Sequence, residues 1–282
     1  MTRHAFVIGQ PIAHSRSPLI HRHWLQVYEI AGEYDPIEVT PEGLPDFFAR
    51  IRAGEFVGGN VTLPHKEQAW ALADTHDPAS RAIAAANTLV LKAGQIHASN
   101  TDHIGFLANL DDRAPGWDEN LETAVVLGAG GASRAIIAAL SARGARTIRI
   151  LNRTPARAGA LAAEMQDKTA ARLSPGGLDD FAGVAPNTDI LVNTSTIGMH
   201  GTRFEGIDIA ALPSHALVTD IVYTPLVTPL LADAAAHGLR IVDGLGMLLH
   251  QAVPGFEAWF GTRPEVTPAL RALVEKDMGL AG

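Results

Sequence analysis

Apolar residues along this chain gather in short runs that are separated by longer mixed stretches. Runs such as Phe6–Ile8 and Ala124–Leu127 are typical of strands, whereas residues 18–30 and 247–260 read as helices. Strands and helices alternate over nearly the whole chain, which is the pattern of a parallel sheet covered by helices, so we predict an α/β protein. The expected strands are residues 6–8, 34–39, 58–62, 89–91, 95–98, 124–127, 147–151, 189–193, 216–222 and 240–242, and the expected helices are residues 18–30, 44–53, 101–110, 134–140, 247–260 and 268–276.

The run Ala124–Leu127 continues into a glycine-rich turn, Gly128–Ser133, and then into an expected helix. A strand, a glycine turn and a helix N-terminus bring backbone N–H groups close to a pyrophosphate, and the helix dipole favours its negative charge. We therefore expect a dinucleotide ligand. Ser133 stands where the usual fingerprint has its third glycine or alanine, so the motif is imperfect.

The next expected strand ends about twenty residues after the turn, at the position that reads the adenosine ribose in such proteins. Asn152, Arg153 and Thr154 stand here, and Arg157 follows shortly afterwards. NAD sites usually carry a carboxylate at this position, whereas a guanidinium accommodates the 2′-phosphate of NADP. This sequence therefore favours NADP(H), against the alternative that Arg153 and Arg157 are ordinary surface residues.

Length and composition fit a two-domain enzyme. The chain has 282 residues, more than a single core usually holds, and its content of 47% hydrophobic and 18% charged residues indicates a folded protein. The net charge of −8 disfavours a nucleic-acid partner, whose phosphates would be repelled. The sequence contains no cysteine, which excludes disulfides and Cys-ligated zinc and is compatible with a reducing cytoplasm.

Neither a membrane segment nor a metal site is indicated. The apolar stretch near the N-terminus is too short for a signal peptide, and no apolar run reaches membrane-spanning length, so we expect a cytoplasmic protein. His21 and His23 are two residues apart and would point in different directions on a helix, and no His-Glu-x-x-His motif occurs. We therefore expect no metal ion.

Three clusters of polar residues lie at the ends of expected elements in the first part of the chain, where α/β proteins build their sites. The first cluster is residues 14–18. Ser17, directly before Pro18, is expected to cap the following helix. This role accounts for Ser17 but leaves Ser15 free for a ligand.

The other two clusters combine an ammonium group with a carboxylate. In residues 59–66 a strand ends in amide and hydroxyl groups and the chain then reaches Lys66. The third cluster joins residues 87–88 to residues 100–102. Asp102 in this cluster could hold the ammonium group of Lys66 and share its proton, as general acid/base chemistry requires.

Taken in order, these motifs and the segment Asp243–Met247 resemble the shikimate dehydrogenase family. Each motif alone is weakly specific, but their ordered combination covers almost the whole chain and is highly specific. The resemblance implies reversible reduction of 3-dehydroshikimate to shikimate by NADPH, a step towards the aromatic amino acids. It also implies a Rossmann-type NADP-binding domain at residues 105–244 and an α/β substrate domain at residues 1–104 and 245–282, which the C-terminal helices complete.

The same resemblance implies residue roles. Lys66 and Asp102 would be the acid/base pair. The substrate, a small polyhydroxy acid, would be bound by Ser15, Ser17, Asn60, Thr62, Asn87, Tyr223 and Gln251. The cofactor would be bound by Gly128, Ala129, Gly130, Gly131, Ala132, Ser133, Asn152, Arg153, Thr154, Arg157, Ile221, Gly244 and Met247.

General chemistry agrees with these roles. A carbonyl group that gains a hydride develops alkoxide character, so it needs a proton donor aimed at its oxygen. A lysine suits this task when a neighbouring carboxylate orients it. A polyhydroxy acid needs short hydrogen-bonding side chains, and the serine, threonine and asparagine residues supply them. The cofactor carries the hydride chemistry, so neither a metal nor a nucleophilic residue is required.

Three residues depart from the family pattern. His65 and His103 adjoin the acid/base pair where the family commonly has an apolar or aromatic residue and a glycine, and Pro78 stands where an acidic residue is frequent.

The alternatives are a quinate/shikimate dehydrogenase of broader specificity, a catalytically silent NADPH-binding sensor, and a folate dehydrogenase. The arginine-bearing loop argues against the NAD preference of the first, the acid/base pair against the second, and the two serines, which suit a small carboxylate, against the third. The sequence leaves monomer and homodimer equally open.

Overall fold

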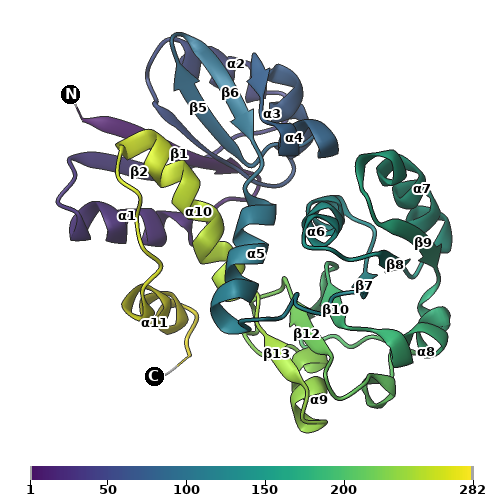
Figure 1. Ribbon diagram of the computed structural model, residues 1–282. Helices are drawn as coiled ribbons and strands as arrows, with labels where there is room; N and C mark the ends of the chain where they lie inside the picture. The colour runs from purple at the N-terminus through teal and green to yellow at the C-terminus, as the bar shows by residue number, and fades with distance from the viewer. Residues whose placement is uncertain (1, 281–282) are drawn as a thin grey trace. The chain divides into compact units, whose positions relative to one another are not determined.

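The computed structural model describes residues 2–280 and divides into two compact units (Figure 1). The first unit contains the chain up to Thr101 and again from Leu249 onward, and the second runs from Asp102 to Leu248. The sequence analysis expected the domain boundaries after residues 104 and 244, and the two units divide after Thr101 and after Leu248. The α10 helix begins in the second unit and ends in the first.

The elements alternate as an α/β protein requires. The strands are β1 (Arg3–Gly9), β2 (Gly32–Glu38), β3 (Gly58–Val61), β4 (Thr75–His76), β5 (Thr88–Lys92), β6 (Gln95–Ser99), β7 (Thr123–Leu127), β8 (Thr147–Leu151), β9 (Arg172–Gly176), β10 (Ile190–Asn193), β11 (Ile197–His200), β12 (Leu217–Asp220) and β13 (Arg240–Val242). The α-helices are α1 (Ser17–Val27), α2 (Leu44–Arg52), α3 (Lys66–Leu72), α4 (Pro78–Ile83), α5 (Asp102–Arg113), α6 (Gly131–Ala142), α7 (Pro155–Met165), α8 (Phe181–Val184), α9 (Pro229–Ala236), α10 (Leu245–Phe260) and α11 (Pro268–Asp277). Short 3₁₀ helices are η1 (Gln166–Lys168), η2 (Leu178–Asp180), η3 (Ala185–Asn187) and η4 (Ile209–Ala211). Among residues 2–280, no helix combines the length and the apolar character needed to cross a membrane.

The second unit is built on a fully parallel sheet with the strand order β13-β12-β10-β7-β8-β9. The chain begins at β7 in the middle, moves outward to β9, and then returns to β10 and moves outward in the other direction. This is the doubly wound order of the Rossmann fold, so the α/β prediction is confirmed. The direction of winding reverses between β7 and β10, and folds of this kind bind ligands at the carboxyl ends of the strands at that point.

Both faces of this sheet are buried, which explains the continuous apolar run of β7. Val126 belongs to the core on one face together with Ile136 of α6. Its neighbour Val125 belongs to the core on the other face together with Leu231 of α9. Because successive side chains of a strand point to opposite faces, a strand covered on both sides must be apolar throughout.

The first unit contains a mixed sheet with the order β2-β1-β3-β5-β6-β4. β1 is parallel to both of its neighbours, β2 and β3, whereas β3 pairs antiparallel with β5. β5 and β6 form an antiparallel hairpin, as the sequence predicted. Phenylalanines fill one core of this unit, where the ring of Phe6 meets that of Phe47 edge to face with centroids 4.9 Å apart.

Several boundaries differ from the expected ones for identifiable reasons. The helix expected over residues 18–30 ends at Val27, and Glu29 adopts a positive φ of 52° that no helix continues. The α5 helix continues past residue 110 to Arg113. Strand β9 was not expected, because it is an edge strand that contains Pro175 and therefore lacks a strand-like pattern. Helices α3, α4, α7, α8 and α9 and strands β4 and β11 were also not among the expected elements.

Gly59 tests how tightly the first sheet is packed. A Cβ atom at this position in β3 would lie 2.4 Å from the carbonyl oxygen of Phe6. We expect Gly59→Ala to destabilise the first unit by about 1–3 kcal/mol, because that oxygen belongs to the backbone of β1 and cannot move aside. Urea unfolding would measure the change. Gly43→Ala is the matched control in the same unit, since its nearest contact would be at 3.4 Å. An unchanged unfolding midpoint for Gly59→Ala would contradict the expected clash.

Candidate functional site

The expected site residues fall into two sets, one in each unit. Every residue expected to bind the cofactor lies in the second unit, together with Asp102 and Tyr223. The first unit holds Ser15, Ser17, Asn60, Thr62, Lys66, Asn87 and Gln251. Each set is described within its own unit.

The glycine turn after β7 is open on its outer side. A Cβ atom on Gly130 or Gly131 would have no neighbour within 4 Å, so the backbone there is accessible to a ligand. Gly128 is different, because its φ is +114° and a Cβ atom would lie 2.9 Å from Thr194 Oγ1. The turn itself therefore requires glycine at that position. Because α6 begins at Gly131, its unpaired N–H groups lie at this opening, which suits an anion.

Ser133 is the departure from the glycine fingerprint, and the structure gives it a role. Its buried Oγ accepts a hydrogen bond from the N–H of Gly130 at 3.1 Å and donates to Thr194 Oγ1 at 2.7 Å. Thr194 Oγ1 in turn donates to the carbonyl oxygen of Leu127 at 2.9 Å, so its own oxygen is the acceptor for Ser133. This chain of hydrogen bonds joins the turn after β7 to the end of β10, across the point where the winding reverses.

Asp220 ends β12 as a buried carboxylate that the sequence analysis did not identify. Its Oδ1 accepts hydrogen bonds from Asn193 Nδ2 and from the N–H of Val222, both at 2.9 Å, and its Oδ2 accepts one from Thr228 Oγ1 at 2.7 Å. Burial raises the pKa of Asp220 to about 6, although these hydrogen bonds favour the charged form. Asp220 thereby fixes the start of the segment that follows β12.

The turn between β13 and α10 makes two close approaches. A Cβ atom on Gly244 would lie 2.6 Å from the carbonyl oxygen of Ile221, so two expected cofactor residues are in contact. A Cβ atom on Gly246 would lie 1.8 Å from Asn109 Oδ1, and Asn109 Nδ2 donates to the carbonyl oxygen of Asp243 at 2.7 Å. Asn109 of α5 therefore holds this turn. It is 134 residues from Asp243, and no local pattern signals the contact.

The arginine-bearing loop follows β8 and leads into α7. Asn152 Nδ2 donates to the carbonyl oxygen of Thr154 at 3.0 Å, which shapes the loop. The side chains of Arg153 and Arg157 are exposed. Because α7 begins at Pro155, both residues lie in or next to the first turn of a helix, whose N-terminus favours a phosphate group.

In the first unit, the buried amide of Asn87 forms hydrogen bonds on both sides. Its Oδ1 accepts from the N–H of Thr101 and from Thr88 Oγ1, both at 2.9 Å, and its Nδ2 donates to Gln251 Oε1 at 3.0 Å. A backbone N–H group can only donate, so this pattern fixes the orientation of both amides. Gln251 therefore turns its Nε2 donor away from Asn87. Thr101 Oγ1 also donates to the carbonyl oxygen of Gln251 at 2.8 Å.

The expected helix cap at Ser17 is wrong. The N-cap position of α1 is Arg16, which already has nearly helical backbone angles and makes no side-chain cap. The N–H of Ser17 is instead accepted by Ser15 Oγ at 3.4 Å, so Ser15 is the capping residue and Ser17 is the residue capped. The hydroxyl of Ser17 is buried and contacts the phenol of Tyr34.

Lys66 and Asp102 are each the first residue of a helix, α3 and α5 respectively. The carbonyl oxygen of Lys66 accepts a hydrogen bond from the N–H of Ala86 at 2.9 Å. The next residue, Asn87, holds Thr101, which directly precedes Asp102 in the chain. The Lys66 side chain is half-buried, and Asp102 is only 7% exposed. Ala86 and Asn87 are consecutive residues, and they therefore fix the backbone at Lys66 and at the residue immediately before Asp102.

Two of the three residues that depart from the family pattern, His65 and Pro78, have a clear structural setting. His65 is buried, and its Nε2 lies 2.7 Å from the carbonyl oxygen of Val39, after β2. Pro78 lies in the first turn of α4, where its lack of an N–H group costs nothing, and Asp77 caps that helix by accepting from the N–H of Ser80 at 2.7 Å. His103 is half-buried beside Asp102 on α5. Within residues 2–280, no three His, Asp or Glu side chains are grouped as metal ligands would be.

A Rossmann sheet with an open glycine turn at the reversal of its winding defines a protein of the dinucleotide-binding class. Comparison with known proteins narrows this class. Family profiles match the chain as shikimate dehydrogenase substrate binding domain over residues 7–89, shikimate / quinate 5-dehydrogenase over residues 115–224, and shikimate 5′-dehydrogenase C-terminal domain over residues 244–274. The chain belongs to the shikimate dehydrogenase family, and the resemblance seen in the sequence is confirmed.

Individual relatives agree with this assignment. A shikimate dehydrogenase (NADP(+)) of Rhizobium meliloti strain 1021 is 53% identical over 277 residues, which are 98% of this chain and 95% of that protein. The structure of shikimate 5-dehydrogenase from Thermus thermophilus in complex with NADP(H) and shikimate has a TM-score of 0.84 and 35% identity, and covers 98% of this chain and 99% of that one. Quinate dehydrogenase from Corynebacterium glutamicum in complex with NAD has a TM-score of 0.89 with 27% identity over the same shares of the two chains.

The raised pKa of Asp220 makes a prediction about stability. The folded protein holds this proton more tightly than the unfolded chain, whose Asp pKa is 3.8, so the stabilisation is complete below about pH 4 and is lost as the pH rises through about 6. Relative to Asp220→Asn, which keeps the side-chain shape, the wild type should lose about 3 kcal/mol between about pH 4 and about pH 7. Urea unfolding at a series of pH values measures the difference. Parallel pH profiles for the two proteins would show that Asp220 does not titrate in this range.

Proposed function

We propose that this protein is an NADP-dependent shikimate dehydrogenase, which reversibly reduces 3-dehydroshikimate to shikimate with NADPH on the route to the aromatic amino acids. The observation that carries this proposal is the match, over nearly the whole chain, to relatives named as NADP(+)-dependent shikimate dehydrogenases. The solved structure of the Thermus thermophilus relative contains both NADP(H) and shikimate. The arrangement of polar groups within each unit supports the same conclusion.

The first unit supplies the substrate groups in this proposal, with residues 1–104 and 245–282 as the substrate domain. The polar residues proposed to bind the carboxylate and hydroxyl groups are Ser15, Ser17, Asn60, Thr62, Asn87 and Gln251, joined by Tyr223 from the other domain. The Asn87 network supports this role, because it fixes the Gln251 amide so that its Nε2 donor points away from Asn87. An amide held in one orientation discriminates between donor and acceptor groups on a polyol.

Residues 105–244 form the cofactor domain in this proposal. The residues present fit a dinucleotide, because Gly130 and Gly131 leave their outer side open at the N-terminus of α6. Arg153 and Arg157 supply exposed guanidinium groups for the 2′-phosphate of NADP(H). Gly244, which lies against the carbonyl of Ile221, and Met247 would flank the nicotinamide.

In the proposed chemical step, side chains of this protein transfer the proton. When bound, NADPH supplies the hydride that reduces the substrate carbonyl carbon. The ammonium group of Lys66 donates a proton to the carbonyl oxygen as alkoxide character develops there. Asp102 orients that ammonium group and, once Lys66 is neutral, passes a proton taken from water to it, so the pair is ready for another turnover. In the oxidative direction, Lys66 in its neutral form removes the proton from the substrate hydroxyl.

The wider setting follows from the same assignment. We propose a cytoplasmic enzyme that acts on small molecules and requires neither a metal ion nor a nucleic acid. It would work as a monomer or as a homodimer. The acid/base pair distinguishes it from a silent NADPH-binding sensor, and turnover decides between the two.

Lys66→Ala tests the proton-transfer role. We expect kcat for the oxidation of shikimate by NADP⁺ to fall by about 10²–10⁴-fold, because the reacting oxygen loses its proton partner. The affinity for NADPH, followed by fluorescence titration, should stay within about twofold of the wild type, because Lys66 and the cofactor residues are separate sets. Lys92→Ala removes an exposed lysine from β5 and is the matched control.

The same assay run with quinate and with NAD⁺ tests the assignment itself. Preferred turnover of quinate would move the protein to the broader quinate/shikimate group. A wild type that binds NADPH but turns over neither polyol would be a sensor. Turnover of shikimate by Lys66→Ala at the wild-type rate would refute the role of the lysine while leaving the assignment in place.

Replacing Arg153 and Arg157 tests the choice of cofactor. In the double variant Arg153→Ala/Arg157→Ala, we expect KM for NADP⁺ to rise by about 10-fold or more, because charge-assisted hydrogen bonds to the phosphate are lost. The KM for NAD⁺ should change by less than about twofold, since NAD⁺ lacks that phosphate. Equal effects on the two cofactors would show that the arginines do not read the 2′-phosphate.

A further inference from the structure

Tyr34 is a buried polar residue of the first unit that no role described so far uses. It lies on β2 and is only 1% exposed. Its hydroxyl is 2.6 Å from Asn60 Oδ1, and it also meets the side chain of Ser17. Burial raises the pKa of Tyr34 well above its usual value, with the contact to Ser17 opposing that rise, so the phenol keeps its proton.

The direction of each hydrogen bond can be assigned from the acceptors. Asn60 Nδ2 lies 3.1 Å from the carbonyl oxygen of Asn87 and 3.3 Å from Thr88 Oγ1. A backbone carbonyl oxygen only accepts, so Asn60 must direct its NH₂ group towards Asn87 and its Oδ1 towards Tyr34. The phenol therefore donates to Asn60. Without that donor, Asn60 Oδ1 would lose its hydrogen bond of 2.6 Å, and the amide would be held mainly through its NH₂ group.

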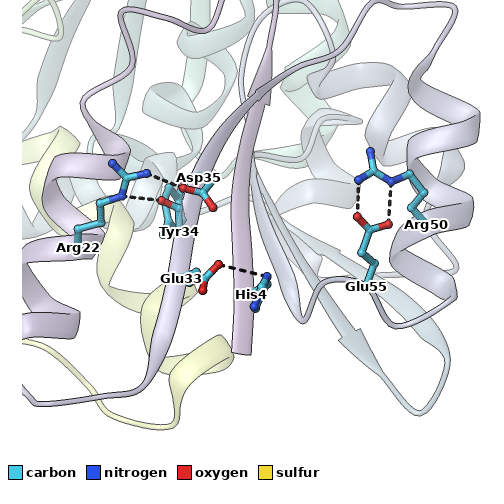
Figure 2. Close-up of polar contacts among 7 residues, drawn as sticks. All are labelled: His4, Arg22, Glu33, Tyr34, Asp35, Arg50 and Glu55. Carbon is cyan, nitrogen blue, oxygen red and sulfur yellow. Dashed lines mark hydrogen bonds and ion pairs between the residues drawn. The ribbon is translucent and has the colours of Figure 1, made fainter. Parts of the chain in front are cut away.

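Tyr34 itself is held firmly by its surroundings. The ring of His21 stacks on it with centroids 4.1 Å apart and planes 15° apart. Burial lowers the pKa of His21 to about 3, although the nearby Asn60 side chain opposes this shift, so the imidazole is uncharged. The backbone is fixed as well, because Arg22 donates to the carbonyl oxygen of Tyr34 at 3.0 Å and to Asp35 Oδ1 at 2.5 Å (Figure 2).

We infer that Tyr34 is a positioning residue for the substrate site, whose phenol holds the Oδ1 end of the Asn60 amide in place through a hydrogen bond. This inference rests on the proposed function, since Asn60 and Ser17 matter here as substrate residues. Tyr34 is too buried to touch a ligand and acts only through these neighbours. The stack with His21 keeps the phenol directed at Asn60, and the uncharged imidazole adds no charge beside it.

Tyr34→Phe is the direct test, because it removes one oxygen and keeps the ring. We expect KM for shikimate to rise by about tenfold, as loss of one buried hydrogen bond to a binding residue does, while kcat changes by less than about twofold. The KM for NADP⁺ should stay within about twofold of the wild type. If Tyr34 had a purely structural role, Tyr34→Phe would lower the unfolding midpoint, and KM for shikimate would not rise relative to KM for NADP⁺.

Two further variants make the test specific. Tyr28→Phe removes the phenol that accepts from the N–H of Glu265 at 3.1 Å, in the same unit but outside the substrate set, and should leave both KM values unchanged. In an Asn60→Ala background, Tyr34→Phe should change KM for shikimate by only about twofold or less, because the two residues then share one effect.

The outcomes separate this inference from the proposed function. If the wild type turns over shikimate and Tyr34→Phe leaves KM for shikimate unchanged, the inference is overturned and the proposed function stands. A tenfold effect that persists in the Asn60→Ala background would also overturn it, because Tyr34 would then act by another route. A wild type without shikimate turnover would remove the proposed function, and this inference would fall with it.

Discussion

The polar network of the first unit depends on one buried amide, Asn87. It is 2% exposed, and its side chain and backbone make contact with several elements at once. Its side chain holds Thr101 at the end of β6 and Gln251 on α10, and its carbonyl oxygen accepts from Asn60 on β3. A buried amide is costly to leave unpaired, so each of these partners is held in one place and in one orientation. Without this constraint the neighbouring hydroxyl and amide groups of the first unit would not be held in fixed orientations.

In the second unit, other buried polar groups hold the strand ends and turns in place. There, Thr194 bridges the end of β7 and the glycine turn, and Asp220 gathers three donors at the end of β12. In the second unit these buried polar groups lie where strands end, because interior positions of a sheet covered on both faces are apolar. The strand ends are also where such folds bind ligands. In the second unit the buried polar groups therefore lie at the edge of the sheet where folds of this kind bind ligands.

The sequence could predict what short-range patterns determine. The strand, glycine turn and helix around Gly128 are specified by adjacent residues, and so is the β5–β6 hairpin. Long-range contacts were not predictable, because nothing near Asn109 signals its bond to Asp243 and nothing near Tyr34 signals its bond to Asn60, 26 residues away. The error at Ser17 has a similar origin. A cap depends on which residue first adopts helical angles, and a Ser-Arg-Ser-Pro segment allows two solutions.

This difference follows a physical division among the polar residues. The groups proposed to meet the substrate include half-exposed ones, such as Lys66, Thr62 and Gln251, whereas groups behind them, such as Tyr34 and His21, are almost completely buried. A half-exposed polar residue at a strand or helix end is visible in a sequence as a polar residue in an expected place. A buried one looks like an isolated irregularity in an apolar stretch, and its meaning appears only when its partner is known. Because the loss of a buried partner leaves a desolvated group unpaired, the less visible layer controls the orientation of the visible one. In the proposed function, the chemistry of the site is therefore set by residues that face the ligand, and its selectivity depends also on buried residues behind them.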